Sequence, residues 1–185
     1  MSLETDKQGP QPRLLTGALV FYCLLVIAAW IWLGFRERRE SVIAMALGDH
    51  GPIVGAMTGL AVGILMTMLL TVTAKWSPRI RSCEGRIREM LGQLDDHQVL
   101  MLSLISAVAE ELFFRAAVQD AVGVPITVAI YVLLNSGRGM LCWLPVSAVS
   151  AAIFGGLVWS GAGLLAATTA HAIVNYLTLR RILSP

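Results

Sequence analysis

The sequence predicts an all-α membrane protein: a bundle of about six transmembrane helices with one amphipathic helix on the membrane surface. Of the 185 residues, 56% are hydrophobic and only 14% are charged, and the mean hydropathy is +0.72. Soluble domains carry about 25% charged residues. Several windows approach the roughly 20 apolar residues that a helix needs to cross a bilayer. The length fits a single polytopic domain over 14–183, preceded by a polar stretch at 1–13 that we expect to be disordered.

The first predicted span covers 14–35 and is too long for a signal-peptide core, so we interpret it as a retained helix. Trp30 and Trp32 lie near its exit, where interfacial anchors are found, and the charged stretch at 36–40 ends it.

The second predicted span, 51–74, carries Gly51, Gly55, Gly59 and Gly63 at a spacing of four residues. Glycines so spaced share one helix face, which lets another backbone approach closely. This face predicts close packing within the chain or, alternatively, a homodimer seam.

Residues 77–98 have the pattern of an amphipathic helix. Apolar and basic residues fall on different faces: Ile80, Ile87, Leu91 and Leu94 on one side, Arg79, Arg81, Arg86 and Arg88 on others. Such a helix is expected to lie on the bilayer with its arginines toward anionic headgroups, or else to be a solvated connection between spans.

Four further spans are predicted at about 99–119, 124–135, 144–159 and 162–180. The sequence NSGRG at 135–139 interrupts the apolar pattern. The second of the four is short enough to be partly re-entrant.

The distribution of Lys and Arg predicts the orientation. With the N-terminus in the cytoplasm, ten basic residues fall on the cytoplasmic side: Lys7, Arg13, Lys75, Arg79, Arg81, Arg86, Arg88, Arg138, Arg180 and Arg181. Three fall on the other side: Arg36, Arg38 and Arg39. Both termini are therefore expected to be cytoplasmic.

Charge and cysteine content exclude some classes of protein. A net charge of +2 argues against a nucleic-acid partner on electrostatic grounds. Cys23, Cys83 and Cys142 are scattered without a CxxC pair, which implies neither a disulfide framework nor a zinc site.

The stretch AEELFFR at 109–115 places three formal charges inside an apolar span. Each would cost roughly 2.5–3.5 kcal/mol at the bilayer centre if it stood alone. Glu111 and Arg115 are four residues apart on one helix face, with Gln119 one turn further, so the first two can form an ion pair. Glu110 points about 100° away and has no charged partner on its own helix, although Ser106 lies one turn below it.

The motif therefore divides into a supported pair and a single carboxyl. An unpaired carboxyl in an apolar site suits general acid–base chemistry near neutral pH. The alternative is an interhelical salt bridge that only fixes packing, but ionisable groups inside membranes are usually functional.

A second constellation is HAIVN at 171–175. His171 and Asn175 are four residues apart and project from one face of the last span. Together they can donate hydrogen bonds to a developing oxyanion. The alternative is a histidine that only bonds a neighbouring helix.

EELFFR and HAIVN, in this order and both in apolar spans, resemble the EExxxR and HxxxN signatures of the CAAX-prenyl-protease and bacteriocin-processing (CPBP) family of intramembrane proteases. The resemblance covers roughly 99–180. It implies that Glu110 activates water for attack on a peptide carbonyl, that Glu111 and Arg115 orient the site, and that His171 and Asn175 stabilise the oxyanion. It implies a glutamic peptidase without cofactor, acting on a membrane-associated protein or peptide.

One family motif is missing. The family carries an FxxxH motif between the other two, and no histidine occurs here between Arg115 and His171. The nearest pattern is Tyr131-Val-Leu-Leu-Asn135, with Asn135 in the place of the histidine. Either Asn135 orients the water for Glu110, or the chain is an inactive pseudoprotease that binds membrane proteins.

Other mechanisms fit less well. A zinc protease needs three good ligands, whereas the spans offer only Glu110, Glu111 and His171 and no HExxH, so we expect no metal. Ser160 with His171 lacks the GxSG context of a rhomboid-type serine protease, and Cys142 has only its position to recommend it. A proton or ion relay would use the same charges, but the chain has no inverted repeat.

We expect a multi-pass protein of a prokaryotic cell (inner) membrane.

Overall fold

The computed structural model describes residues 12–135 and 141–184. The predicted disorder at 1–13 therefore falls outside the described residues as far as residue 11, and most of the predicted interruption at 135–139 does too. Every regular element in the described part is helical, which confirms the all-α fold class. In chain order the elements are α1 (Pro12–Phe35), α2 (Ser41–Leu47), α3 (Gly51–Trp76), α4 (Pro78–Leu91), α5 (Asp96–Glu111), the π-helix η1 (Leu112–Gln119), α6 (Asp120–Leu134), the short 3₁₀ helix η2 (Leu141–Trp143), α7 (Leu144–Trp159) and α8 (Leu164–Leu183).

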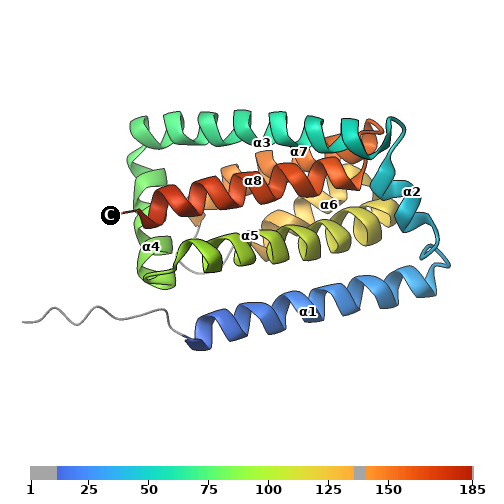
Figure 1. The fold of residues 1–185 in the computed structure, drawn as a ribbon, viewed down its shortest axis with the longest axis horizontal. Coiled ribbons are helices and arrows are strands. Elements are labelled where there is room, and N and C mark those ends of the chain that lie inside the picture. Colours follow the sequence, from blue (N-terminus) through green and yellow to red (C-terminus); the bar gives the residue numbers. More distant parts are fainter. Residues whose placement is uncertain (1–11, 136–140, 185) are drawn as a thin grey trace, which may run out of the picture.

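Four helical stretches of the described chain are long and apolar enough to cross a membrane: Leu14–Phe35, Gly51–Trp76, Asp96–Leu134 and Leu141–Trp159. The protein is therefore a membrane protein by the length and composition of its helices. The long elements α1, α3, α5, α6, α7 and α8 run alongside one another, with α8 in the middle of the bundle (Figure 1).

The 39-residue stretch Asp96–Leu134 consists of two legs. Gly123 adopts φ 78° and ψ 170°, a non-helical conformation that glycine reaches without steric cost, and Pro125 follows it. In a straight helix, residues 110 and 131 would be about 31 Å apart. The hydroxyl of Tyr131 instead lies 3.0 Å from Oε2 of Glu110, so the chain turns back and α6 returns along η1 toward the end of α5. The separate spans predicted at 99–119 and 124–135 are these two legs.

Helix α4 crosses the end of the bundle at which α1 begins and α8 ends (Figure 1). Its buried residues are Cys83, Ile87 and Leu91, and the last two pack with Ile182 of α8 and Leu14 of α1. The amphipathic pattern predicted over 77–98 is thus present but shorter. It ends at Leu91 because Gly92 has φ 64°, and α5 then begins with a capping box between Asp95 and Gln98.

The glycine face of α3 packs against α8. A Cβ atom added at Gly55, Gly59 or Gly63 would lie 3.0, 2.3 or 2.9 Å from a backbone oxygen of Ala162, Ala166 or Ala170, respectively. Gly51 does not belong to this face, since it begins the helix with φ 80°. Packing within the chain therefore uses these glycines, and a second copy could reach them only by displacing α8.

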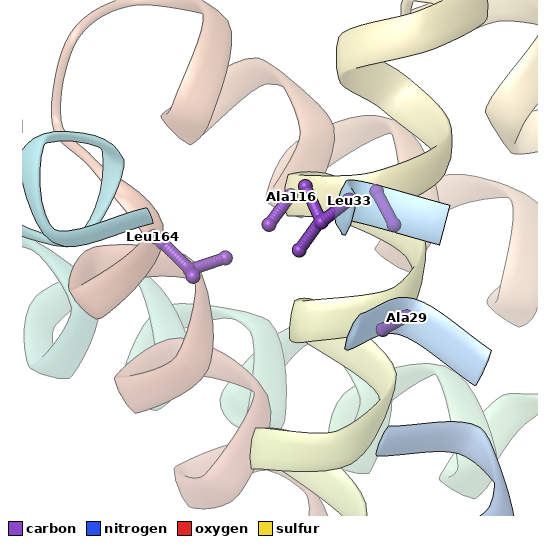
Figure 2. Packing of buried hydrophobic residues seen from close by; sticks show 5 residues of the cluster. Ala29, Leu33, Ala116 and Leu164 are labelled. Carbon is purple, nitrogen blue, oxygen red and sulfur yellow. The ribbon is translucent and has the colours of Figure 1, made fainter. Parts of the chain in front are cut away.

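The C-terminal part of helix α1 packs against the bundle. Ala29 and Leu33 are fully buried in a cluster with Ala116 and Ala117 of η1 and Leu164 of α8 (Figure 2). Just beyond this cluster, the arginines that follow α1, Arg36 and Arg38, form ion pairs with Asp120 at 2.7 and 2.8 Å.

The expectation of no disulfide is wrong for two of the three cysteines. Cys83 of α4 and Cys142 of η2 form a disulfide, with a Cα–Cα distance of 6.2 Å, whereas Cys23 is free and exposed. Their separation of 59 residues and the lack of a motif gave no sign of it. Only the fold, which lays α4 over the bundle end beside η2, brings them together.

Candidate active site

The carboxylate of Glu111 and the guanidinium of Arg115 form the predicted ion pair. Arg115 Nε donates to Glu111 Oε2 at 3.0 Å, and neither side chain is exposed. Glu111 ends α5 and Arg115 lies in η1, so the pair spans the junction of the two helices. No local pattern of residues indicates that the α-helix continues here as a π-helix, a feature often found at functional sites.

The rest of the Arg115 guanidinium contacts an aromatic ring. Its carbon Cζ lies 5.7 Å from the ring centroid of Tyr131, a cation–π arrangement. Nη1 and Nη2 are buried and make no hydrogen bond within the described part of the chain. One turn further, Gln119 Nε2 donates to the backbone oxygen of Gly155 at 3.0 Å, which ties η1 to α7.

Glu111 also holds His171. Nδ1 of His171 lies 2.8 Å from Glu111 Oε1, and the imidazole stacks on Phe154 with a centroid distance of 4.9 Å. Because Glu111 is ion-paired with Arg115, its carboxylate accepts hydrogen bonds, so Nδ1 carries the hydrogen. In neutral His171, Nε2 is then a hydrogen-bond acceptor.

Glu110 has different surroundings from Glu111. Its side chain is 16% exposed, against 0% for Glu111. The Tyr131 hydroxyl donates to Glu110 Oε2 at 3.0 Å, and Nε2 of His171 lies 4.0 Å from the same oxygen. The predicted division between a supported and a separate glutamate therefore matches the geometry.

Asn175 bonds a neighbouring helix. Its Nδ2 donates to Ser106 Oγ at 3.0 Å, and Ser106 in turn donates to the backbone oxygen of Ser103 at 3.1 Å. Nδ2 carries a second hydrogen that this contact does not use.

The side chain of Asn135, which was expected to orient a water for Glu110, bonds its own helix instead. Its Nδ2 donates to the backbone oxygen of Tyr131 at 2.9 Å, at the end of its own helix. This contact engages one of its two amide hydrogens. The side chain that the structure brings to Glu110 from α6 is Tyr131.

These side chains surround a cavity of about 290 Å³. Glu110, His171 and Asn175 line it, together with Tyr131 and Asn135. Each enclosed water needs roughly 10–15 Å³ of such volume, so several waters fit. Glu111 and Arg115 are buried and do not line the cavity. They contact it indirectly, because Glu111 bonds His171 and Arg115 lies over the ring of Tyr131.

Sequence reasoning missed Tyr131 and Phe154 as site residues and gave Ser106 no contact role. Tyr131 is the first residue of the Tyr-Val-Leu-Leu-Asn pattern, in which only the last residue, Asn135, was expected to have a role. The Phe154–His171 stack depends on the contact between α7 and α8 and leaves no local signal. Within residues 12–135 and 141–184, no group of three or more His, Cys, Asp or Glu side chains is arranged to hold a metal ion.

Comparison of the chain with protein-family models, with curated proteins and with solved structures finds no match.

Proposed function

We propose that the protein is an intramembrane endopeptidase of the glutamic type, which cleaves a membrane-associated protein or peptide near its anchor or tail. The observation that carries the proposal is the convergence of Glu110, His171 and Asn175 on one cavity inside a helical bundle. These residues come from helices 60 or more positions apart in the chain. The resemblance of EELFFR and HAIVN to the CPBP signatures supports the same reaction.

The spacing between Glu110 and His171 suits one water molecule. A water within about 2.8 Å of both atoms would bridge the 4.0 Å between Glu110 Oε2 and His171 Nε2 at an angle near 90°. Glu110 is the carboxylate available as a base, because Arg115 and His171 occupy Glu111.

In the proposed reaction, the water oxygen bonds to the peptide carbonyl carbon while Glu110 takes one water proton. The second hydrogen of Asn175 Nδ2 donates to the resulting oxyanion. His171 donates to it through Nε2–H when it enters the reaction as imidazolium, and it keeps that proton throughout. Collapse of this intermediate breaks the C–N bond, and the proton held by Glu110 passes to the leaving nitrogen. Glu111 keeps the imidazole oriented throughout, as an orienting carboxylate does in hydrolytic triads.

The proposal includes a multi-pass topology in a prokaryotic cell (inner) membrane with both termini in the cytoplasm. The ten-to-three distribution of basic residues supports this orientation. The substrate is a protein or peptide that the bilayer itself presents to the cavity.

The second candidate is a pseudoprotease that binds membrane proteins without cleaving them. The observation that favours it is the side chain of Asn135, which cannot take a proton and has an amide hydrogen engaged by its own helix.

One experiment separates the two functions. Purified protein in liposomes receives a pool of synthetic peptides, each with one hydrophobic membrane anchor, and mass spectrometry reads the products. Cleavage by the wild type in the presence of a chelator, lost in Glu110→Gln, supports the protease. Peptides retained on the protein but never cut support the pseudoprotease. Loss of cleavage with chelator and its return with zinc would overturn the mechanism.

A further inference from the structure

We propose that Tyr131 is the positioning residue for Glu110: its hydroxyl holds the carboxylate in the orientation from which it takes the water proton. This inference rests on the proposed function for its catalytic consequence, whereas the contact itself can be tested without any cleavage.

The Tyr131 hydroxyl and the Tyr22 hydroxyl of α1 both contact Glu110. The Tyr131 hydroxyl donates to Oε2 at 3.0 Å, across a sequence separation of 21 residues. Oε2 is also the oxygen that His171 Nε2 approaches at 4.0 Å. The hydroxyl and the imidazole therefore meet the same carboxylate oxygen from α6 and α8, respectively.

Two side chains of η1 contact the Tyr131 ring. Phe114 meets it edge to face with a centroid distance of 4.8 Å, and the Arg115 guanidinium lies over it at 5.7 Å. Only 7% of the residue is exposed, and Ala151 of α7 belongs to the same cluster. A ring held in this way leaves its hydroxyl little freedom to leave Glu110.

The path of the backbone makes the Tyr131–Glu110 hydrogen bond possible. The reversal at Gly123 brings α6 back along η1, so that the side chain of Tyr131 reaches the last turn of α5. Helix α6 thus supplies an O–H donor, which can orient a carboxylate but does not compete with it for the water proton. Tyr131 connects the two halves of the EELFFR motif, because its hydroxyl binds Glu110 and its ring covers Arg115.

The test begins with Tyr131→Phe, which removes the hydroxyl but keeps the ring that contacts Phe114 and Arg115. Loss of a hydrogen bond to a charged group changes a rate or equilibrium constant by roughly 10- to 100-fold. We expect kcat on the anchored peptide that the wild type cleaves to fall by about that factor, with KM changed by less than about twofold. Tyr176→Phe is the matched control, since Tyr176 stacks with Arg180 and does not line the cavity. A Tyr131→Phe variant with wild-type kcat would overturn the proposal.

A second measurement does not depend on cleavage. Dicyclohexylcarbodiimide labels protonated carboxyls in apolar surroundings, and mass spectrometry locates the product at Glu110 through its loss in Glu110→Gln. Removing a donor to the carboxylate makes the protonated form more populated, so Tyr131→Phe should label at least about threefold faster than the wild type or Tyr176→Phe. Glu111, which keeps Arg115 and His171, is the internal control.

The two failures are distinguishable. If the wild type cleaves no peptide while labelling of Glu110 still responds to Tyr131→Phe, the protease function fails and the positioning contact stands. If labelling is the same in both proteins, the positioning role is overturned whether or not the wild type cleaves.

Discussion

Nδ1 of His171 lies 2.8 Å from Oε1 of Glu111, and this contact determines which imidazole nitrogen faces Glu110. The same carboxylate holds Arg115 through its other oxygen at 3.0 Å. Glu111 therefore contacts both Arg115 and His171, and Nε2 of His171 is the imidazole nitrogen that faces Glu110. The position of the imidazole at the site thus depends on a residue that does not line the cavity.

His171→Ala should slow cleavage by about 10²–10³, the usual loss for one donor to an oxyanion. The protein should still be made and purified, because the buried ion pair of Glu111 with Arg115 remains. Rates on the same anchored peptide give the measurement. His97→Ala is the control, since His97 is exposed at the start of α5. Equal rates for both variants would remove His171 from the mechanism.

Glu111→Gln should destabilise the protein much more than Glu110→Gln. Removing one partner of a buried ion pair leaves the other charge uncompensated, which costs about 3–5 kcal/mol. Glu111 and Arg115 are such a pair, whereas Glu110 is partly exposed and bonded by a neutral hydroxyl. Thermal unfolding in detergent should therefore show a lower midpoint for Glu111→Gln and a near-wild-type midpoint for Glu110→Gln. If both variants unfolded at the same temperature, the two glutamates would not have separate roles.

The features that the sequence predicted depend on local spacing. Apolar runs predicted the long helices, and the i,i+4 relations predicted the Glu111–Arg115 pair and the common face of His171 and Asn175. These relations survive in any fold that keeps the helices. The short helix α2, Ser41–Leu47, was not predicted because seven residues give too little periodicity.

What the sequence could not predict depends on how the helices pack. Tyr131 reaches Glu110 only because Gly123 reverses the chain, and Cys83 meets Cys142 only because α4 lies over the bundle end. The π-helix after Glu111 has no propensity signal, since its residues are ordinary helix formers. Asn135 occupies the place of the second-motif histidine in the sequence, whereas the contact to Glu110 from α6 is made by Tyr131, one turn earlier.

Gly59→Ala should destabilise the packing of α3 on α8. The added Cβ would lie 2.3 Å from the backbone oxygen of Ala166, so a helix must shift, which typically costs about 1–3 kcal/mol. Gly156→Ala is the matched control in α7, because a Cβ there meets no atom within 4 Å. In an open helix position this change stabilises by roughly 0.5–1 kcal/mol. Thermal unfolding should rank Gly59→Ala below the wild type and Gly156→Ala at or above it; the reverse order would contradict the packing.

Reporter fusions should place residue 44 and the C-terminus on opposite sides of the membrane. Residue 44 lies in α2, at the end of the bundle opposite to the end of α8 (Figure 1). A cytoplasmic reporter should be active after residue 184 and inactive at residue 44, and a periplasmic reporter should show the converse. Activity of one reporter at both sites would contradict the up-and-down arrangement.

The redox state of Cys83 and Cys142 provides an independent check of the orientation. Cys83 lies in α4, which crosses the bundle end at which α1 begins and α8 ends (Figure 1), and cytoplasmic cysteines are kept reduced. The structure joins the two cysteines, whereas the proposed cytoplasmic orientation of that end predicts free thiols, so acid quenching and thiol alkylation of growing cells decide between the two. Exposure of isolated membranes to air should then join them, because their Cα–Cα distance of 6.2 Å is within disulfide range. On a non-reducing gel the oxidised protein should migrate differently from the reduced protein. Cys83→Ser should abolish this difference, whereas Cys23→Ser should leave it intact. A pair already oxidised in growing cells would place this end, and both termini, on the oxidising side of the membrane.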